Sequence, residues 1–240
     1  MPAEKATGIV VRTTDWSETS RIATIWTREL GKVSVLAKGG RRLKSNFEVA
    51  LDLLTVCGIV LLRKSSGGLD LLTEAQVVER FAGLRTNLPA LYAGYYIAEL
   101  LGEGTQDYDP HPKLFDSSLD TLRKLSAGGD PSALVAGYEL EWLAELGLKP
   151  ILDRCAHCGT QRLDTGMIAM SPMAGGVVCG PCGKEFNDRR TVSMDGLVCL
   201  NELVMGEHPA VGREVREVLG FYISSVLGRR PRMLNFIAVG

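Results

Sequence analysis

The chain is 240 residues long, 45% hydrophobic and 23% charged, with a formal net charge of −1 at pH 7. This composition is typical of an ordinary globular protein and leaves room for one large domain or two to three small ones. The longest apolar stretch, residues 53–62, is far shorter than the roughly 18 residues that indicate a membrane span. No apolar signal-peptide core follows Met1, so we expect a cytoplasmic protein.

The charge is unevenly distributed along the chain. Residues 1–80 hold 12 Lys and Arg against 9 Asp and Glu, a net charge of +3, and the remainder has a net charge of −4. So mild an imbalance is usually solvated surface and indicates little by itself.

The first 80 residues favour β-structure. Five β-branched, partly alternating segments end at polar or glycine breaks: residues 7–13, 20–27, 32–37, 51–62 and 69–77. Residues 29–32 form a hairpin signal between the second and third segments. Short strands in such number within about 75 residues predict a small closed barrel, either OB-like or SH3-like.

After Arg80 the apolar residues adopt a helical spacing. The first expected helix presents Leu88, Leu91, Tyr92, Tyr95 and Ala98 on one face, and the second presents Leu114, Leu119, Leu122 and Leu125. A final helix over residues 209–227 presents Val211, Val215, Val218, Tyr222 and Val226.

The third expected helix has the clearest ends. Asp130 is a good N-cap, Pro131 suits the first helical position, and Gly147 suits the C-terminal cap. The buried stripe expected between these ends consists of Val135, Tyr138, Trp142 and Leu146.

Four of the six cysteines form two matching pairs, Cys155–Cys158 and Cys179–Cys182, each a Cys-x-x-Cys turn followed by glycine. The 20 intervening residues fit the spacing of a zinc site, and four thiolates complete the tetrahedral shell that zinc prefers. We expect the glycines to adopt positive φ. Because four thiolates leave no open position for water, the predicted zinc ribbon of residues 150–190 is structural and holds one Zn²⁺.

Other uses of these cysteines are weaker hypotheses. Disulfides would need an oxidising compartment, and a redox Cys-x-x-Cys would not need a second pair. Iron could occupy the same thiolates, so the identity of the metal is inferred from ligand softness. We expect His157 to face solvent, and Cys57 and Cys199, which lie in apolar runs, to be buried.

Residues 38–46 contain four cations and no acid: Lys38, Arg41, Arg42 and Lys44. Their guanidinium and ammonium groups suit phosphate, and loops beside the binding face of an OB barrel commonly hold single strands. A solvated turn is the alternative. Three aromatic residues, Trp16, Trp26 and Phe47, could stack on bases, but we expect each to be core. No Walker A sequence is present, so the chain lacks a recognisable motif for nucleotide hydrolysis.

Several further segments are distinctive: residues 8–12, 18–22, 30–32, 37–45, 72–75, 145–148 and 152–159. Through them the chain resembles the bacterial RecO family of recombination mediators over nearly its whole length. The resemblance implies an N-terminal OB fold, a helical middle and a zinc-bearing insert that some members lack. It also implies binding of single- and double-stranded DNA, strand annealing and a complex with RecR. That complex helps RecA to replace the single-strand-binding protein SSB, whose C-terminal tail RecO also contacts.

Carried onto this chain, the resemblance makes Lys38, Arg41, Arg42 and Lys44 the leading DNA contacts, with Arg21 and Arg12 second. It places the pocket for the SSB tail among residues 88–147. Because the C-terminal part is acidic on balance, a DNA path there would depend on local clusters such as residues 229–232, which could equally be cations at a helix C-terminus.

We therefore expect an α+β protein with four parts. These are an OB-fold DNA-binding domain (1–80), a helical domain (81–149), a zinc-ribbon insert (150–190) and C-terminal helices that complete the helical domain (191–240). The expected function is non-enzymatic DNA handling in the cytoplasm at the nucleoid, without a membrane partner. The alternative is a zinc-ribbon interaction scaffold with incidental DNA contact. An enzyme is disfavoured because His111, His157 and His208 lie in no recognisable catalytic spacing.

Overall fold

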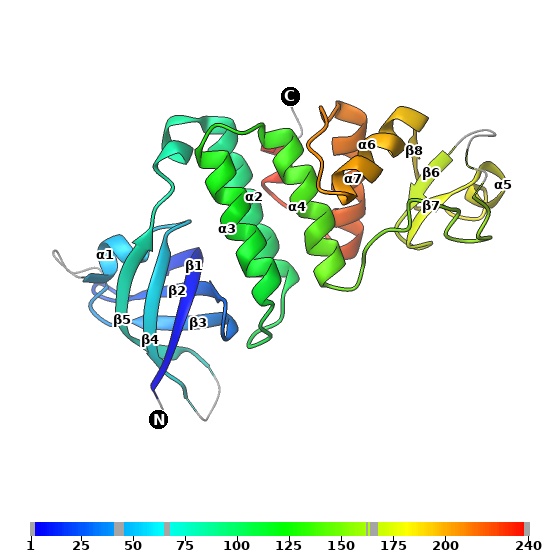
Figure 1. Ribbon diagram of the computed structural model, residues 1–240. Coiled ribbons are helices and arrows are strands. Elements are labelled where there is room, and N and C mark those ends of the chain that lie inside the picture. Colours follow the sequence, from blue (N-terminus) through cyan, green and yellow to red (C-terminus); the bar gives the residue numbers. More distant parts are fainter. Residues whose placement is uncertain (1–2, 41–45, 65–67, 162, 164–167, 238–240) are drawn as a thin grey trace. The chain divides into compact units, whose positions relative to one another are not determined.

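The protein is described by a computed structural model over residues 3–40, 46–64, 68–161, 163 and 168–237. The chain divides into two compact units, Met1–Ser126 and Ala127–Gly240. The first contains a β-barrel and two long helices, and the second contains further helices and a small sheet (Figure 1). The division into four parts expected from the sequence stays a prediction.

A closed five-stranded barrel forms the start of the N-terminal unit. Its strands are β1 (Ala3–Asp15), β2 (Arg21–Thr27), β3 (Gly31–Ala37), β4 (Val56–Leu62) and β5 (Asp70–Glu79), in the order β1-β2-β3-β5-β4. Strand β1 pairs antiparallel with both β2 and β4, and β3 pairs parallel with β5 from Val35↔Asp70. This arrangement confirms the OB-like barrel.

Period-two alternation creates the core of the barrel, most clearly in β3, where every second residue is buried. The core includes Val10, Ala23, Ile25, Val33, Val35, Ile59, Leu61, Leu72 and Ala75. Each large aliphatic side chain buried there contributes about 1.5–3 kcal/mol. Cys57 belongs to this core, as expected, and its burial raises the pKa of its thiol to about 12.

The fourth strand expected from the sequence begins too early. Residues 51–55 form turns, and β4 starts only at Val56. A short helix that the sequence did not indicate, α1 (Asn46–Ala50), precedes them, and Ala50 and Leu51 pack into the barrel core. Leu54 has a φ of 62°, which is incompatible with an extended strand. Residues 51–55 were predicted as strand because they are largely apolar, and that prediction is wrong.

Two long helices follow a 3₁₀ turn, η1 (Ala82–Thr86). They are α2 (Leu88–Gly104) and α3 (Pro112–Ser126). The helix predicted around Leu88 is confirmed, but its buried face is only partly as expected: Ala98 is buried and Leu88 is exposed. Ala93, Gly94 and Ile97 are buried as well. Gly94 permits close packing, since a Cβ there would lie 2.8 Å from Cδ1 of Leu54.

Trp26 of β2 connects the barrel to these helices through a hydrogen bond and a ring contact. It is fully buried, its indole donates to Oγ1 of Thr105 at 3.1 Å, and its ring stacks on Phe115 at 6.0 Å. Lys32 donates through Nζ to the carbonyls of Gly102 and Thr105. Its positive charge interacts favourably with the negative, C-terminal end of the α2 dipole. The expectation that Trp26 is a core residue is confirmed.

In the C-terminal unit, helix α4 (Pro131–Glu145) begins as the sequence indicated, and its C-cap is Leu146, one residue before the expected Gly147. Asp130 accepts hydrogen bonds from the amides of Ser132 and Ala133 at 3.3 and 3.1 Å, and Gly147 has a φ of 74°. The expected stripe is buried at Val135, Tyr138 and Trp142, whereas Leu146 is the half-buried C-cap.

Three further helices complete this unit: α6 (Met194–Val204), α7 (Arg213–Val226) and α8 (Leu234–Ile237). The sequence indicated helices within residues 191–240 but did not locate α6, whose N-cap is Ser193. The helix expected over residues 209–227 starts four residues late, because Gly212 is its N-cap, and Val211 therefore lies outside it. Within the described ranges, every helix is too short or too polar to span a lipid bilayer.

A small sheet of order β7-β6-β8 is built from β6 (Ile168–Ser171), β7 (Gly176–Val178) and β8 (Arg190–Val192). One-turn helix α5 (Gly180–Gly183) follows β7. The segment at Ile151 exchanges backbone hydrogen bonds with this sheet: its amide donates to Gly175 at 3.0 Å, and its carbonyl accepts from Val177 at 2.8 Å. These bonds bring the residues after Ile151 against the turn that follows β7.

Candidate metal centre and nucleic-acid interface

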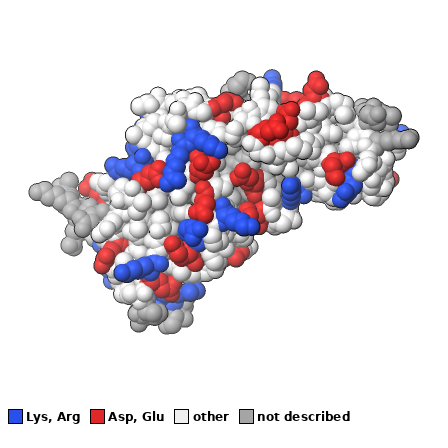
Figure 2. All heavy atoms as spheres, viewed as in Figure 1, with Lys and Arg blue, Asp and Glu red and all other residues white. Residues whose placement is uncertain are grey.

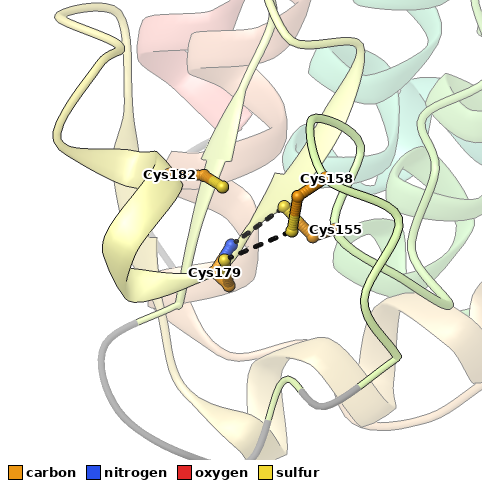
Figure 3. Close-up of side chains that lie close together, drawn as sticks. All are labelled: Cys155, Cys158, Cys179 and Cys182. Atoms are coloured by element: carbon orange, nitrogen blue, oxygen red, sulfur yellow. Dashed lines mark hydrogen bonds between the residues drawn. The ribbon is translucent and has the colours of Figure 1, made fainter.

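The four paired cysteines converge on one point (Figure 3). All four sulfurs lie within 4.8 Å of one another, and the Sγ atoms of Cys158 and Cys179 are 3.8 Å apart. A tetrahedral shell with Zn–S bonds of about 2.3 Å has sulfur–sulfur edges of about 3.8 Å. The cysteines therefore fit a four-coordinate metal ion.

Two similar turns hold these sulfurs in place. The amide of Gly159 donates to the carbonyl of Cys155 at 2.8 Å, and the amide of Gly183 donates to that of Cys179 at 2.8 Å. The backbone amide of Cys179 lies 3.4 Å from Sγ of Cys155, which connects the two turns. Gly159 has the expected positive φ of 76°, but Gly183 ends α5, so positive φ there was a wrong prediction.

The thiols influence one another's ionisation. Burial disfavours the thiolate of Cys155, but backbone hydrogen bonds from Cys158, Cys179 and His157 lower its pKa to about 6. The pKa of Cys182 is raised, first through its hydrogen bond with the side chain of Cys179 and then by burial. Thiolates this close repel one another, and a divalent cation removes that repulsion.

His157 lies beside the cluster but forms other contacts. Its side chain is 44% exposed, its Nε2 is 3.5 Å from a carboxylate oxygen of Glu185, and its ring packs edge-on against Phe186. The solvent-facing position agrees with the sequence. Cys199 is buried in α6, away from the four-cysteine group, also as expected.

Two of the described members of the predicted DNA contacts, Lys38 and Arg21, lie at one end of the barrel, and Arg12 lies further along β1, opposite the middle of β2. Lys38 is exposed directly after β3, and Arg21 starts β2, paired with Ala37 at the end of β3. Arg12 is exposed on β1 opposite Thr24 of β2. The other three predicted contacts, Arg41, Arg42 and Lys44, lie outside the described residues.

These three cations differ in their pairing. Nε of Arg21 donates to Oδ1 of Asp15 at 3.3 Å, which ties together the ends of β1 and β2. Neither Arg12 nor Lys38 forms an ion pair with any carboxylate in the described ranges. Both are therefore available for a phosphate oxygen.

Three other exposed arginines of this unit are already engaged by carboxylates. They form the pairs Arg28–Asp116, Arg85–Asp52 and Arg123–Glu79. The hydrogen bond between Arg28 and Asp116 lowers the pKa of the Asp116 carboxyl group and raises the pKa of the Arg28 guanidinium. On the face shown in Figure 2, Lys and Arg alternate with Asp and Glu and form no single basic patch. The positive charge at the end of the barrel near Lys38 is therefore local and does not continue as a basic patch over the face shown in Figure 2.

The three aromatic residues singled out by the sequence have different environments. Trp26 is buried and Phe47 is half-buried against the barrel core. Trp16 is 64% exposed, so its assignment to the core was wrong. It lies in the tight turn between β1 and β2, where residues 14–19 are all exposed.

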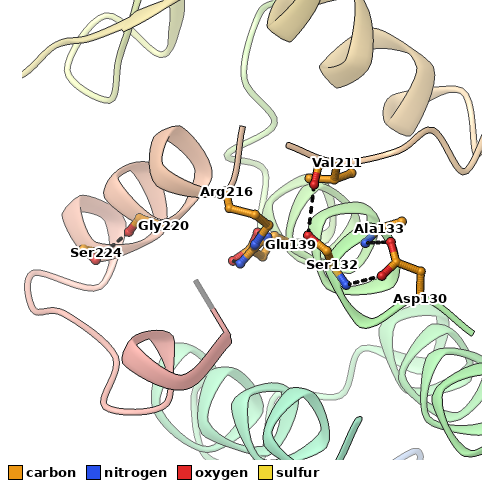
Figure 4. Close-up of polar contacts among 8 residues, drawn as sticks. All are labelled: Asp130, Ser132, Ala133, Glu139, Val211, Arg216, Gly220 and Ser224. Carbon is orange, nitrogen blue, oxygen red and sulfur yellow. Dashed lines mark hydrogen bonds and ion pairs between the residues drawn. The ribbon is translucent and has the colours of Figure 1, made fainter. Parts of the chain in front are cut away.

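Two features of the C-terminal unit had no signal in the sequence. Arg216 and Glu139, on α7 and α4, form a buried ion pair with contacts of 2.6 and 3.2 Å (Figure 4). Arg190 lies over the ring of Phe221 at 4.3 Å, and with Arg230 it lines a cavity of about 400 Å³. Both depend on residues far apart in the chain.

Comparison with known proteins covers nearly the whole chain. The family described as "Recombination protein O N terminal" matches residues 1–81, and "Recombination protein O C terminal" matches residues 85–234. A protein named "DNA repair protein RecO" from Rhodopirellula baltica is 36% identical over 95% of this chain and 97% of its own length. A protein of the same name from Anaeromyxobacter dehalogenans is 32% identical over 99% of this chain and 96% of its own length.

A relative from Listeria monocytogenes, also named "DNA repair protein RecO", is 33% identical over 75% of this chain and 68% of its own length. The matches therefore include the barrel, the helices and the segment with the four cysteines. The chain belongs to the recombination protein O (RecO) family.

Proposed function

We propose that this chain is a non-enzymatic DNA-binding recombination mediator that binds and anneals single-stranded DNA. The observation that carries the proposal is the OB-like barrel with Lys38 and Arg21 at one end, where the cationic segment of residues 38–44 begins, and with Arg12 further along β1. The name shared by the relatives, DNA repair protein, supports a role on DNA.

The proposed mechanism is electrostatic. Cations at the end of the barrel bind phosphates along one strand, which neutralises part of the repulsion between two complementary strands and favours annealing. Phosphate contacts carry no sequence information, so binding tolerates any base sequence. Duplex DNA offers the same phosphates and should bind through the same cations.

The proposed partners follow from membership of the family. With RecR, the chain helps RecA to replace SSB on gapped DNA, and its helices at residues 88–147 contact the C-terminal tail of SSB. Work on chromosomal DNA would place it in the cytoplasm at the nucleoid.

We also propose that Cys155, Cys158, Cys179 and Cys182 hold one structural Zn²⁺. When bound, the ion supplies a closed shell of four thiolates and no open position for a substrate. The side chains of residues 150–190 would then keep their arrangement without a large apolar core of their own.

The test is affinity for a labelled single-stranded oligonucleotide as a function of salt concentration. Each phosphate contact on single strands contributes about −0.7 to the slope of log K against log salt. Replacing Arg41, Arg42 and Lys44 by Ala should therefore flatten the slope by about 2. A matched control replaces Arg28, Arg85 and Arg123 by Ala, which removes the same charge from arginines already bound to carboxylates.

The control should leave the slope nearly unchanged. Equal salt slopes for the wild-type protein and the variant that lacks Arg41, Arg42 and Lys44 would show that these cations do not contact DNA phosphates. No measurable affinity for bare oligonucleotides would instead favour the alternative function, an interaction scaffold that contacts DNA only incidentally.

A further inference from the structure

Trp16 is unlike the other two tryptophans of the chain. Its side chain is 64% exposed, whereas Trp26 and Trp142 are fully buried. A large apolar ring gains little free energy of burial at such a position. Exposed aromatic rings that touch no partner within their own protein are common at sites of recognition.

The backbone around Trp16 is ordered by local hydrogen bonds. The amide of Trp16 donates to the carbonyl of Ser20 at 3.0 Å, and the amide of Ser17 donates to the same oxygen at 3.2 Å. The amide of Ser20 donates in return to Oγ of Ser17 at 3.1 Å, and the ion pair Asp15–Arg21 closes the turn at its base. The turn therefore presents the indole on a fixed support.

This turn lies beside the start of the basic segment. Arg21, which ends the turn, pairs with Ala37, and Lys38 follows Ala37 directly. A Cβ on Gly40 would be 3.5 Å from Cβ of Arg21, so the chain leaves β3 against the base of the turn. Trp16 and the cations thus emerge from adjoining strand ends.

Cations that suit phosphate lie beside this turn. Lys38 forms no ion pair with a carboxylate of the described ranges, Arg21 is bound to Asp15, and Arg12 lies further along β1. In OB folds the loop between the first two strands is one of those that contact oligonucleotides. Stacking of a base on an exposed aromatic ring is tolerant of sequence, as annealing requires.

We propose that Trp16 is a stacking site for an unpaired nucleobase of a DNA strand whose phosphates contact the adjoining cations. This inference rests on the proposed function and adds to it the part of the nucleotide that is bound. A stacking site at Trp16 would also bind single strands in preference to duplexes, because bases within a duplex are stacked on one another and cannot reach the ring.

Intrinsic fluorescence provides the test, because Trp16 is the only exposed tryptophan of the three. A single-stranded oligonucleotide should quench this fluorescence and protect it from acrylamide. An oligonucleotide of the same length built of abasic sites keeps the phosphates and should bind without quenching. Trp16→Phe, which retains an aromatic ring, should bind within a few-fold of the wild-type protein.

Trp16→Ala should bind single strands about 5- to 100-fold more weakly with the same salt slope, and should bind duplex DNA as the wild-type protein does. Val78→Ala is the matched control, since Val78 is an exposed apolar residue of β5 with 63% exposure. It should leave both affinities unchanged.

Equal affinities of Trp16→Ala and the wild-type protein for single strands, or equal quenching by abasic DNA, would overturn the inference. The proposed function would survive that result, because binding through phosphates alone would remain. Failure of the wild-type protein to bind any oligonucleotide would overturn both.

Discussion

The buried ion pair of the C-terminal unit allows a sharp test of its energetics. Arg216 is 3% exposed and Glu139 is fully buried, and two hydrogen bonds join the guanidinium to the carboxylate (Figure 4). Arg216→Leu would leave the carboxylate in the interior without its cation. Loss of one partner of a buried pair costs about 3–5 kcal/mol of unfolding free energy.

Removal of both charges should have a much smaller effect. In Glu139→Leu, Arg216→Leu no unpaired charge remains, and such replacements are often neutral or stabilising. Arg213→Leu is the matched control on the same helix, because it breaks an ion pair of 2.7 Å with Glu217 whose side chains are 81% and 57% exposed. Exposed pairs of this kind contribute at most about 1 kcal/mol.

The assay is urea unfolding followed by fluorescence in a Trp16→Phe, Trp26→Phe background. Trp142, fully buried on the same helix as Glu139, is then the only tryptophan and reports the C-terminal unit. A midpoint for Arg216→Leu that matches the control, or a double variant as unstable as the single one, would refute this account of the pair.

Two further predictions concern the metal centre and a glycine. A strong chelator, or Cys182→Ala, should raise hydrogen exchange in residues 150–190 while the barrel stays protected, because structural metal binding is coupled to local folding. Cys199→Ala is the control and should leave hydrogen exchange unchanged. Unchanged hydrogen exchange after chelation and in Cys182→Ala would exclude a structural metal. Gly31→Ala should destabilise the protein more than Gly128→Ala, as judged by thermal unfolding. Both glycines have positive φ, of 70° and 92°, but only at Gly31 would a Cβ lie 2.4 Å from the carbonyl oxygen of Asp109. Equal losses would show that this close approach carries no cost.

Local patterns were sufficient to predict much of the fold. Strict alternation in Gly31–Ala37 indicated a strand with one buried face, and Asp130 with Gly147 marked the ends of a helix. The spacing of the four cysteines predicted their convergence, since each pair needs only one turn of backbone.

Features that depend on distant residues could not be predicted in this way. Glu139 and Arg216 are 77 positions apart, and each resembles an ordinary surface charge in its own helix. The burial of Gly94 rather than Leu88 in α2 follows from the packing of the helix against Leu54, which its own sequence does not show. Trp16 looked like a core residue because hydrophobicity does not reveal that residues 14–19 form an exposed turn.

Photo-crosslinking with a single-stranded oligonucleotide tests most directly whether the barrel holds the strand. We predict crosslinks at Trp16 and within residues 38–44, and few around the metal centre. A map with crosslinks confined to residues 127–240 would contradict the proposal that the end of the barrel at Lys38 is the DNA-binding surface.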